Sequence, residues 1–349
     1  MRKTFVSVVI VNYNGGQYLP HCLHALKMQS RLPDEIIVVD NLSVDGSADR
    51  IAKEHPDITL LRMDANLGFA AANNIAFEHI ASQARVSTHR DDPQSASLQS
   101  ELAHRWVALL NPDTIPRSDW LAALLAAARS KLDFDVFASK LISAEDPNIL
   151  DGQGDIHHVS GLSWRRHHGK RYSQIKGKPL IDPLFSPCAA AALYRFSRIR
   201  EVNGMDERYF CYHEDVDLMF RLRLTGSKVF YAANSVVAHH GSGITGTSSD
   251  FSVYHGHRNL VWSYVKNMPG WLFWRYLPQH IMLNIFSVIF YSLKGRPRVI
   301  LRAKLHAIKG LPKVLEQRRA IQNGRTVSDD CIHRSLAKGW LTPYLFRRR

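Results

Sequence analysis

The sequence predicts an α/β protein with a doubly wound, mostly parallel sheet, continued by a basic and partly amphipathic helical segment at the C-terminus. Three features predict this fold: short β-branched runs alternate with helix-like stretches, polar clusters follow those runs, and positive charge gathers near the C-terminal end. Strands that alternate with helices pair in parallel, because each crossover helix returns the chain to the same end of the sheet. With 349 residues, 45% of them hydrophobic, the chain can bury a sizeable core.

The first two strands are predicted at Phe5 to Val11 and at Glu35 to Val39, with a helix-like stretch between them. The N-terminal residues also resemble a signal peptide, because basic residues precede an apolar run. However, NYNGG stands where small cleavage-site residues would be expected. We therefore predict a β-α-β unit that begins with the first strand.

The next elements continue this alternation. Ile58 to Arg62 is predicted as a strand, Ala70 to Ala81 as a helix, Trp106 to Leu110 as a strand and Trp120 to Lys131 as a helix. The polar clusters NYN, DN and NPD follow three of the strands. Ligands of doubly wound sheets bind beyond the carboxyl ends of the strands, so the pattern predicts a site at this edge.

Three further segments have distinct compositions. Residues 82 to 104 are polar and patternless, which predicts a surface insertion and leaves disorder open. Asp151 to Pro187 is rich in Gly, His and Arg and is predicted to be extended or looped. Val216 to Leu224 has helical apolar spacing that ends before Gly226, a residue typical of helix C-termini.

Trp271 to Leu293 is the most apolar stretch, but Arg275, Pro278 and several polar residues interrupt it. A membrane-spanning helix needs about 20 predominantly apolar residues, so we predict an interfacial helix or hairpin instead. The alternative is a helix that packs against the rest of the protein.

Charge is distributed unevenly along the chain. Residues 251–349 carry 18 Lys and Arg against 3 Asp and Glu, whereas residues 1–250 carry 27 against 28. This asymmetry indicates a polyanionic partner for the C-terminal segment, either anionic lipid or nucleic acid. Lys294 to Lys313 is the part best suited to anionic lipid.

Several motifs are absent from the sequence. The four cysteines lie far apart without a CxxC pair, which argues against a zinc knuckle or a disulfide framework and favours a reducing compartment. Neither GxxxxGK[ST] nor GxGxxG follows the first strand, which disfavours kinases and dehydrogenases.

Asn111-Pro112-Asp113 directly follows a strand that looks buried. Side chains at such a rigid edge can hold a hard cation and a diphosphate. The alternative is a simple turn, because Asn and Pro are common turn residues.

Glu214, Asp215 and Asp217 lie at the start of a predicted helix. Capping and the helix dipole explain one carboxylate there. Three within four residues, flanked by aromatic residues, repel one another and would raise at least one pKa, which is a setting for a general base.

His239-His240-Gly241 follows the apolar run SVVA. A neutral imidazole at this position could bind a metal in the site predicted beyond the carboxyl ends of the strands. The alternative is a hydrogen-bonded surface histidine.

Six segments, taken together and in this order, resemble the family 2 glycosyltransferases of GT-A fold, particularly rhamnosyltransferase-like members. They are SVVIVNYNGG, IIVVDNLSVDGS, NLGFAAANN, LLNPDT, YHEDVDLMFRLRLTG and VVAHHGS. The resemblance implies a nucleotide-diphosphate-sugar donor, dTDP- or UDP-linked, held by one set of residues. That set is Asn12, Tyr13, Asn14, Asp40, Asn66, Gly68, Phe69, Asn73 and Asn111.

The resemblance also implies a divalent cation, Mg²⁺ or Mn²⁺, that bridges the two phosphates. Asp113 matches the last position of the family's DxD-type motif, and His239 is expected to be the second protein ligand. Asn111 replaces the first Asp, so the diphosphate itself must supply much of the coordination.

The family's catalytic base corresponds to Asp215, with Glu214 and Asp217 orienting it or the acceptor. This implies inverting transfer to a hydroxyl of a lipid-linked saccharide or another cell-envelope glycan. A QxxRW motif is absent, which argues against a processive polysaccharide synthase, and Asn41 stands where an aspartate is common in the family.

The resemblance divides the chain into a GT-A domain, residues 1–265, and a basic amphipathic helical segment for membrane association, residues 266–349. We expect a cytoplasmic protein, peripherally bound to the inner face of the cell membrane through anionic lipid, and no nucleic-acid partner. The assignment requires Asp40, Asp113, Asp215 and His239 to converge around one cavity.

Two other functions stay open from the sequence. A nucleotidyltransferase would also use a cation and a nucleotide on an α/β sheet, but it gives no reason for the Glu-Asp cluster. A non-enzymatic membrane-binding or nucleic-acid-binding protein would use the basic segment, although residues 1–250 are nearly neutral.

Overall fold

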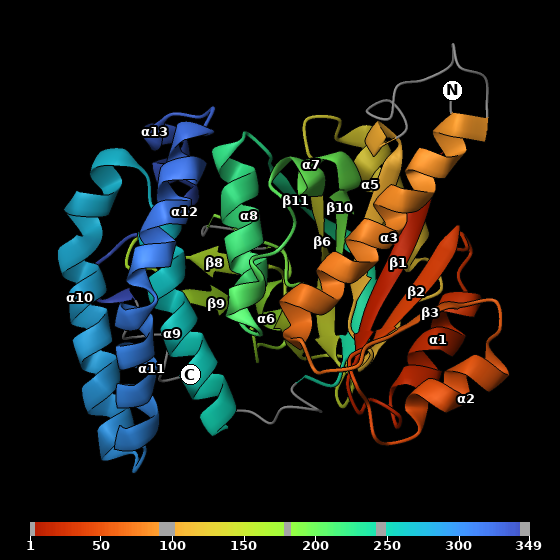
Figure 1. Cartoon of the computed structure of the whole chain (residues 1–349), viewed down its shortest axis with the longest axis horizontal. Helices are drawn as coiled ribbons and strands as arrows, with labels where there is room; N and C mark the ends of the chain where they lie inside the picture. Colours follow the sequence, from red (N-terminus) through yellow and green to blue (C-terminus); the bar gives the residue numbers. More distant parts are fainter. Residues whose placement is uncertain (1–3, 91–101, 178–182, 242–248, 343–349) are drawn as a thin grey trace.

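The computed structural model describes residues 4–90, 102–177, 183–241 and 249–342. Within these residues, nine strands form the main sheet (Figure 1). They are β1 (Phe5–Asn12), β2 (Glu35–Asp40), β3 (Thr59–Arg62), β4 (Arg105–Leu110), β5 (Thr114–Pro116), β6 (Val136–Ser143), β7 (Leu150–Gly152), β10 (Ala191–Arg195) and β11 (Val229–His239). The order is β3-β2-β1-β4-β10-β6-β11-β5, with β7 paired to β6.

The main sheet is mostly parallel, as predicted. β1 pairs in parallel with both β2 and β4, β2 with β3, and β6 with β11. β10 is antiparallel to both of its neighbours, so β6 and β11 point the same way as β1 to β4. The chain first winds outward from β1 to β3 and then returns to the other side of β1, which creates a topological switch point between β1 and β4.

Helices cover both faces of this sheet and bury two apolar cores. On one face lie α1 (Leu19–Lys27), α2 (Ser47–Glu54) and α5 (Trp120–Ser130), with Leu23, Ile51 and Trp120 in the core. On the other face lie α3 (Gly68–Arg90), α7 (Phe196–Glu201) and α8 (Glu214–Leu224), whose core includes Phe77, Phe196 and Leu218.

Helix α3 is longer than predicted. Residues 82–90, expected to be part of a patternless insertion, continue the helix, because Ala84 is buried and Gln83 donates a hydrogen bond to Glu35 of β2 at 2.8 Å. The prediction for 82–90 is therefore wrong. Residues 91–101 of the predicted insertion lie outside the described residues.

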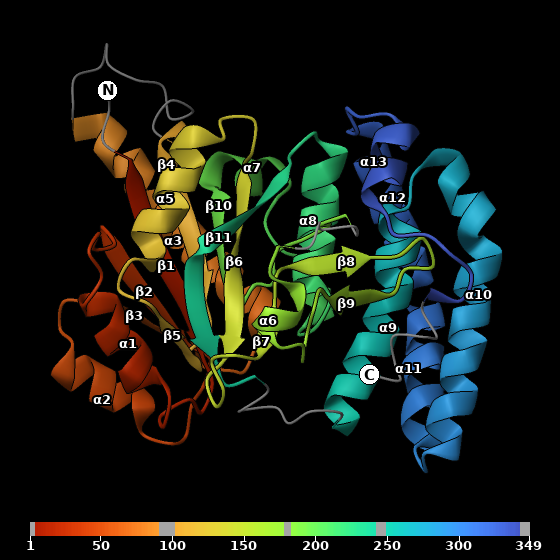
Figure 2. The same cartoon turned by 180° about the vertical axis from the view of Figure 1, so that it is seen from behind.

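The segment predicted to be extended or looped contains small elements. β8 (Asp155–His157) and β9 (Ser163–Arg165) pair with each other, and α6 (Tyr172–Ile175) follows them. The 3₁₀ helix η1 (Glu207–Tyr209) then leads into α8. β8, β9 and α6 lie between the main sheet and the C-terminal helices (Figure 2).

Five helices form a layer beyond α8: α9 (Asp250–Asn267), α10 (Gly270–Leu293), α11 (Pro297–Lys309), α12 (Leu311–Asn323) and α13 (Asp329–Ser335) (Figure 1). Their core is continuous with the rest, because Leu272 and Ile332 pack with Val216 and Phe220 of α8. Among the described residues, none of the helices combines the length and apolarity that crossing a bilayer requires.

Helix α10, which covers the apolar stretch, has features of both alternatives: an interfacial helix and a helix packed against the rest of the protein. One face, including Leu272, His280 and Leu283, is buried against the protein. The other face exposes apolar side chains along its length, and Trp274 is 71% exposed. The exposed set, which we call the α10 apolar face, is Trp271, Trp274, Ile281, Met282, Ile285, Phe286, Ile289 and Leu293.

Candidate active site

A cavity of about 560 Å³ opens beside the switch point, near the carboxyl ends of β1 and β4. This size suits a small organic ligand. Its walls come from segments far apart in the sequence: Val11, Tyr13, Asn41, Asn66, Gly68, Phe69, Asn111, Pro112, Asp113, Arg165, Cys188, Ala189, Ala190, Phe210, Cys211, Tyr212, Glu214, Asp215, His239, Ser249 and Phe251. Asp113, Asp215 and His239 therefore converge as predicted, whereas Asp40 does not reach the wall.

Five of the predicted donor residues line the cavity: Tyr13, Asn66, Gly68, Phe69 and Asn111. The other four, Asn12, Asn14, Asp40 and Asn73, are not among the lining residues. The first set therefore lies where donor contact is possible and the second set does not line the cavity, and the donor roles predicted for both sets stay predictions.

Asn12 and Asp40 shape the site from behind its wall. Both are buried, and the Asn12 amide donates to Asp40 Oδ1 at 2.9 Å and to Ser47 Oγ at 2.8 Å. Asp40 Oδ2 accepts from the Ser43 backbone N–H at 3.1 Å. With their polar atoms used in this way, the two side chains hold the ends of β1 and β2 in place.

Asn14 and Asn73 also bind the protein itself. Asn14 Oδ1 accepts from the Val44 backbone N–H at 2.8 Å, and the Asn73 amide donates to the Phe69 carbonyl at 2.8 Å. These contacts organise neighbouring loops. They explain why Asn14 and Asn73, which lie in segments that the sequence assigned to the donor site, do not line the cavity.

Asn41, which the sequence analysis noted but did not place among the donor residues, is a lining residue. Its amide donates to Asn66 Oδ1 at 2.9 Å, and its own Oδ1 accepts from the Leu67 backbone N–H at 2.8 Å. Position alone could have identified it, because it directly follows the end of β2. An asparagine here presents a neutral amide to the cavity.

The metal prediction rests on Asp113 and His239, which are both buried at the cavity wall. His239 Nε2 lies 3.4 Å from Asp113 Oδ1. Two ligand atoms at this separation can share one cation, and a Mg²⁺ or Mn²⁺ site that uses few protein ligands completes its shell with phosphate and water. Burial opposes ionisation of Asp113, but the hydrogen bond and charge of His239 lower its pKa overall. The residues present therefore fit a divalent cation.

Asp151 of β7 is a site residue that the sequence did not identify. Its Oδ2 accepts a hydrogen bond from His239 Nδ1 at 2.7 Å, and the carboxylate is also paired with Arg165. A carboxylate on one imidazole nitrogen fixes the tautomer and directs the other nitrogen towards a metal. Here the other nitrogen is Nε2, which faces Asp113.

We expect Asp151→Asn to weaken binding of Mn²⁺ in the presence of a nucleoside diphosphate by about 10- to 100-fold, because such carboxylates orient metal-bound histidines. Calorimetry with Mn²⁺ measures this directly. Asp146→Asn, at a partly exposed carboxylate in the turn after β6, is the matched control. Equal Mn²⁺ affinity in Asp151→Asn and wild type would rule out this orienting role.

Glu214 and Asp215 begin α8 and reach the cavity together. Asp215 Oδ1 accepts from the Val216 backbone N–H at 2.8 Å, and Oδ2 accepts from the Ala189 backbone N–H at 3.3 Å. Burial raises the pKa of Asp215, and burial together with the charge of Asp215 raises the pKa of Glu214 well above its usual range. Asp215 is thus the better placed proton acceptor, and burial beside Asp215 favours the neutral form of Glu214.

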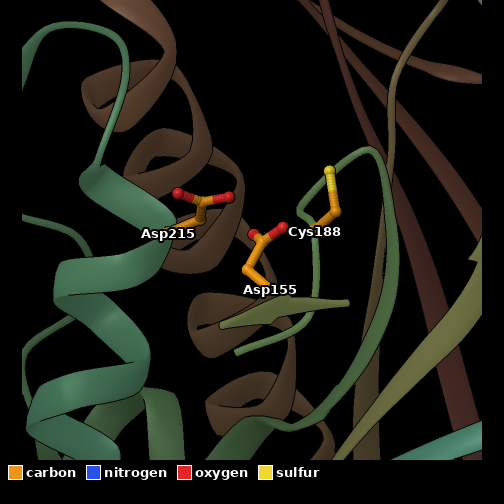
Figure 3. A group of neighbouring side chains, drawn as sticks. All are labelled: Asp155, Cys188 and Asp215. Carbon is orange, nitrogen blue, oxygen red and sulfur yellow. The ribbon is translucent and has the colours of Figure 1, made fainter. Parts of the chain in front are cut away.

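Asp155 and Cys188 complete the surroundings of Asp215 (Figure 3). Their ligand atoms and that of Asp215 all lie within 4.8 Å of one another, and the two carboxylates point towards each other. Burial and the charge of Asp215 raise the pKa of Asp155 to about 7, and burial raises the pKa of the Cys188 thiol. A protonated thiol is a poor metal ligand, and Arg165 already supplies positive charge here. Asp155 and Cys188 therefore suit the surroundings of a base at Asp215 better than a metal site, and Asp113 is the better candidate for the cation.

Asp217 is not part of the cavity wall, although the sequence grouped it with the catalytic carboxylates. It is wholly buried, and its carboxylate contacts Lys266 at 2.7 Å, Arg221 at 2.9 Å and the Tyr209 hydroxyl at 3.1 Å. It lies two residues after Asp215 on α8, so its side chain emerges on a different face of the helix. It therefore joins α8 to α9, and its predicted role in orienting Asp215 or the acceptor stays a prediction that its own contacts do not support.

The fold and the cavity together define a class: a glycosyltransferase of the GT-A fold. Comparison with known proteins gives the family. The chain belongs to glycosyltransferase family 2, because the family model described as glycosyl transferase family 2 matches residues 7–202, more than half of the chain. This membership disfavours the nucleotidyltransferase and the non-enzymatic binding protein.

Two curated relatives and one solved structure have informative names. The chain is 30% identical to an N-acetylglucosaminyl-diphospho-decaprenol L-rhamnosyltransferase of Mycobacterium tuberculosis H37Rv over 77% of this chain and 86% of the relative. It is 40% identical to the rhamnosyltransferase WbbL of Escherichia coli K12 over 47% and 57%. A mannosyltransferase from Pyrobaculum calidifontis, solved with GDP-Man and Mn²⁺, has a TM-score of 0.52 at 14% identity over 100% of this chain and 89% of that chain, which supports the fold.

Proposed function

We propose that the protein is an inverting, metal-dependent glycosyltransferase that moves a sugar from a nucleotide diphosphate to a hydroxyl of a lipid-linked saccharide or another cell-envelope glycan. The single observation that carries the proposal is the cavity at whose walls Asp113, His239 and Asp215 meet. Inverting transfer needs a base for the acceptor hydroxyl and charge stabilisation for the leaving diphosphate. Both kinds of group border the same space.

Asp215 is the proposed base. Its carboxylate takes the proton of the acceptor hydroxyl while the hydroxyl oxygen attacks the anomeric carbon and the bond to the diphosphate breaks on the opposite face. Neutral Glu214 can donate a hydrogen bond to an oxygen in the cavity, which would orient the acceptor. A covalent sugar–enzyme intermediate is not needed in this scheme.

Asp113 and His239 are the proposed protein ligands of Mg²⁺ or Mn²⁺, with Asp151 orienting the imidazole. When bound, the cation supplies charge that neutralises the leaving diphosphate. The donor lies along Tyr13, Asn41 and the segment from Asn66 to Phe69.

Rhamnose from a dTDP- or UDP-linked donor is the first candidate for the sugar, because two relatives are named rhamnosyltransferases. The mycobacterial relative is also named for an N-acetylglucosaminyl-diphospho-decaprenol acceptor. A polyprenyl-diphosphate saccharide is accordingly the first acceptor to try.

The test is a screen of nucleotide sugars for thermal stabilisation and for turnover with Mg²⁺ or Mn²⁺, followed by NMR of the product's anomeric configuration. We expect stabilisation by one nucleotide-sugar class, metal-dependent transfer and inverted configuration. A product with retained configuration would rule out the inverting scheme, and turnover in excess chelator would rule out the metal.

Peripheral association with an anionic membrane is the second part of the proposal. The α10 apolar face points to solvent, and the adjacent helix α11 exposes Leu301, Leu305 and Ile308 beside the cations Arg298 and Arg302. Apolar side chains beside Lys and Arg favour the bilayer interface, and each cation near an anionic surface contributes about 1 kcal/mol. Such docking at the inner face of the cell membrane would bring the cavity close to a lipid-linked acceptor.

We expect the double substitution Ile285→Glu and Ile289→Glu to reduce co-sedimentation with anionic phospholipid vesicles more than tenfold. Each isoleucine that leaves the interface loses roughly 1.5–3 kcal/mol of burial. Added salt should weaken binding of the wild type, because the cations also contribute.

The control is Leu132→Glu, at an apolar residue that is 76% exposed between α5 and β6, far from α10. Point substitutions are preferable to deletion of the helices, because Leu272 and Ile332 share a core with α8. Vesicle binding that is equal in the double variant and in wild type would exclude the α10 apolar face as the membrane contact.

A further inference from the structure

The loop between η1 and α8, residues 210–213, has a strained backbone. Phe210, Tyr212 and His213 have φ values of 63°, 67° and 68°, in a region that residues with side chains rarely adopt. At Phe210, ψ is −66° and the Cys211 N–H donates to the Tyr209 carbonyl at 2.7 Å, which makes a γ-turn of the rare positive-φ kind. Such a conformation persists only where surrounding contacts enforce it.

The loop decides where α8 begins. His213 is the N-cap residue in the left-handed conformation, without a side-chain cap, and Glu214 and Asp215 follow at once. The direction of these carboxylates therefore depends on the backbone of the loop. A relaxed loop would turn the first residues of α8 and move Asp215 relative to the cavity.

Asn259 of α9 contacts this backbone at three points. Its side-chain amide donates to the carbonyl oxygens of Tyr209 at 2.9 Å, Cys211 at 3.0 Å and Tyr212 at 2.7 Å. Asn259 is wholly buried, so water does not compete for these bonds. Two amide hydrogens serve three acceptors, and all three acceptors belong to the strained turn or its continuation.

Two further contacts hold the loop from the outside. The Arg258 guanidinium donates to the Arg208 and Tyr209 carbonyls at 2.9 and 3.0 Å. At the start of α3, which lines the proposed sugar-donor site, the Ala70 N–H donates to the Phe210 carbonyl at 3.2 Å. Gly68 also packs closely against the loop, because a Cβ on it would lie 2.5 Å from the same carbonyl oxygen. The loop is thus fixed between the donor-side start of α3 and helix α9.

We propose that Asn259 is a positioning residue for transfer: its amide holds the 210–213 loop in the strained conformation that directs Asp215 into the cavity. The inference rests on the proposed role of Asp215 as the base. Asn259 does not line the cavity and touches neither reactant, so it acts only through the backbone. The helix that carries Asn259 also packs against α11 and α12, which ties the geometry of the base to the C-terminal layer.

We expect Asn259→Ala to lower kcat by roughly 10- to 100-fold, because small displacements of a catalytic group have effects of this size. The donor KM and the affinity for the nucleoside diphosphate should stay within about twofold of wild type, since the donor side of the cavity is intact. The acid limb of the pH–rate profile should also move to lower pH. Relaxation of the loop exposes Asp215 and so removes the burial that raises its pKa, while Glu214, Asp155 and Arg165 remain beside it.

The matched control is Asn267→Ala, at an asparagine of the same helix that is equally buried but donates to Asp217 rather than to the loop. It should lose thermal stability and keep kcat and the pH profile. If Asn259→Ala does not fold, Arg258→Gln removes the outer contacts at a partly exposed position and should lower kcat in the same direction by a smaller factor.

Asp215→Asn is measured in parallel to separate the two proposals. If Asp215→Asn is inactive while folded Asn259→Ala and Arg258→Gln both have wild-type kcat and pH profiles, the positioning role of Asn259 is wrong and the base stands. If Asp215→Asn retains turnover, the proposed base itself is wrong. A fall in kcat in both Asn259→Ala and Asn267→Ala that only follows thermal stability would also overturn the inference.

Discussion

Asp215→Asn is expected to abolish transfer while the protein still binds its nucleotide. The substitution keeps the size of the side chain and removes the proton acceptor, and loss of a general base alone costs roughly 10² to 10⁴ in rate. Product analysis measures the transfer, and calorimetry with the nucleoside diphosphate measures the binding. The donor contacts that we propose come from the ends of β1 and β2 and from the start of α3, so the affinity should be unchanged.

Glu214→Gln distinguishes the two neighbouring carboxylates. Glu214 is held neutral, so an amide of the same size should cost less than tenfold. In wild type, the acid limb of kcat should lie above the usual aspartate pKa of about 4, because burial raises the pKa of Asp215 and activity is lost as the pH falls through it. Greater loss in Glu214→Gln than in Asp215→Asn would reverse the assignment of the base.

The second large effect is expected for Asp113→Asn. Removal of the carboxylate leaves His239 as the remaining protein ligand that we propose, and loss of the cation removes several kcal/mol of stabilisation from the leaving diphosphate. At about 1.4 kcal/mol per tenfold, transfer should fall by roughly 10² to 10⁴. Calorimetry should show that Mn²⁺ no longer strengthens binding of the nucleoside diphosphate.

The control is His240→Ala, because His240 neighbours the proposed ligand but packs against Tyr18 with ring centroids 4.9 Å apart and does not line the cavity. It should keep the Mn²⁺ effect. Activity of Asp113→Asn that still responds to Mn²⁺ as wild type does would place the cation elsewhere, and the group of Asp155, Cys188 and Asp215 would then be the next site to examine.

The local sequence pattern determined the elements of the N-terminal half and the class of the protein. β1, β2, β4 and α5 lie within one or two residues of their predicted bounds, because alternating β-branched and helical patterns report which face of each element is buried. Asn111 to Asp113, Glu214, Asp215 and His239 were found because a strand end or a helix start fixes where such side chains emerge. The family was also readable from the order of its motifs.

Only the tertiary structure decided which polar side chains reach the cavity. Asn12, Asp40 and Asp217 have the residue types of a site, yet their polar atoms are taken by Ser47, Asn12 and Lys266 from distant segments. Asp151 and Asn259 stand in no motif, and their partners lie 88 and about 50 residues away along the chain. Hydrogen bonds between remote segments depend on packing in three dimensions, and local periodicity carries no information about them.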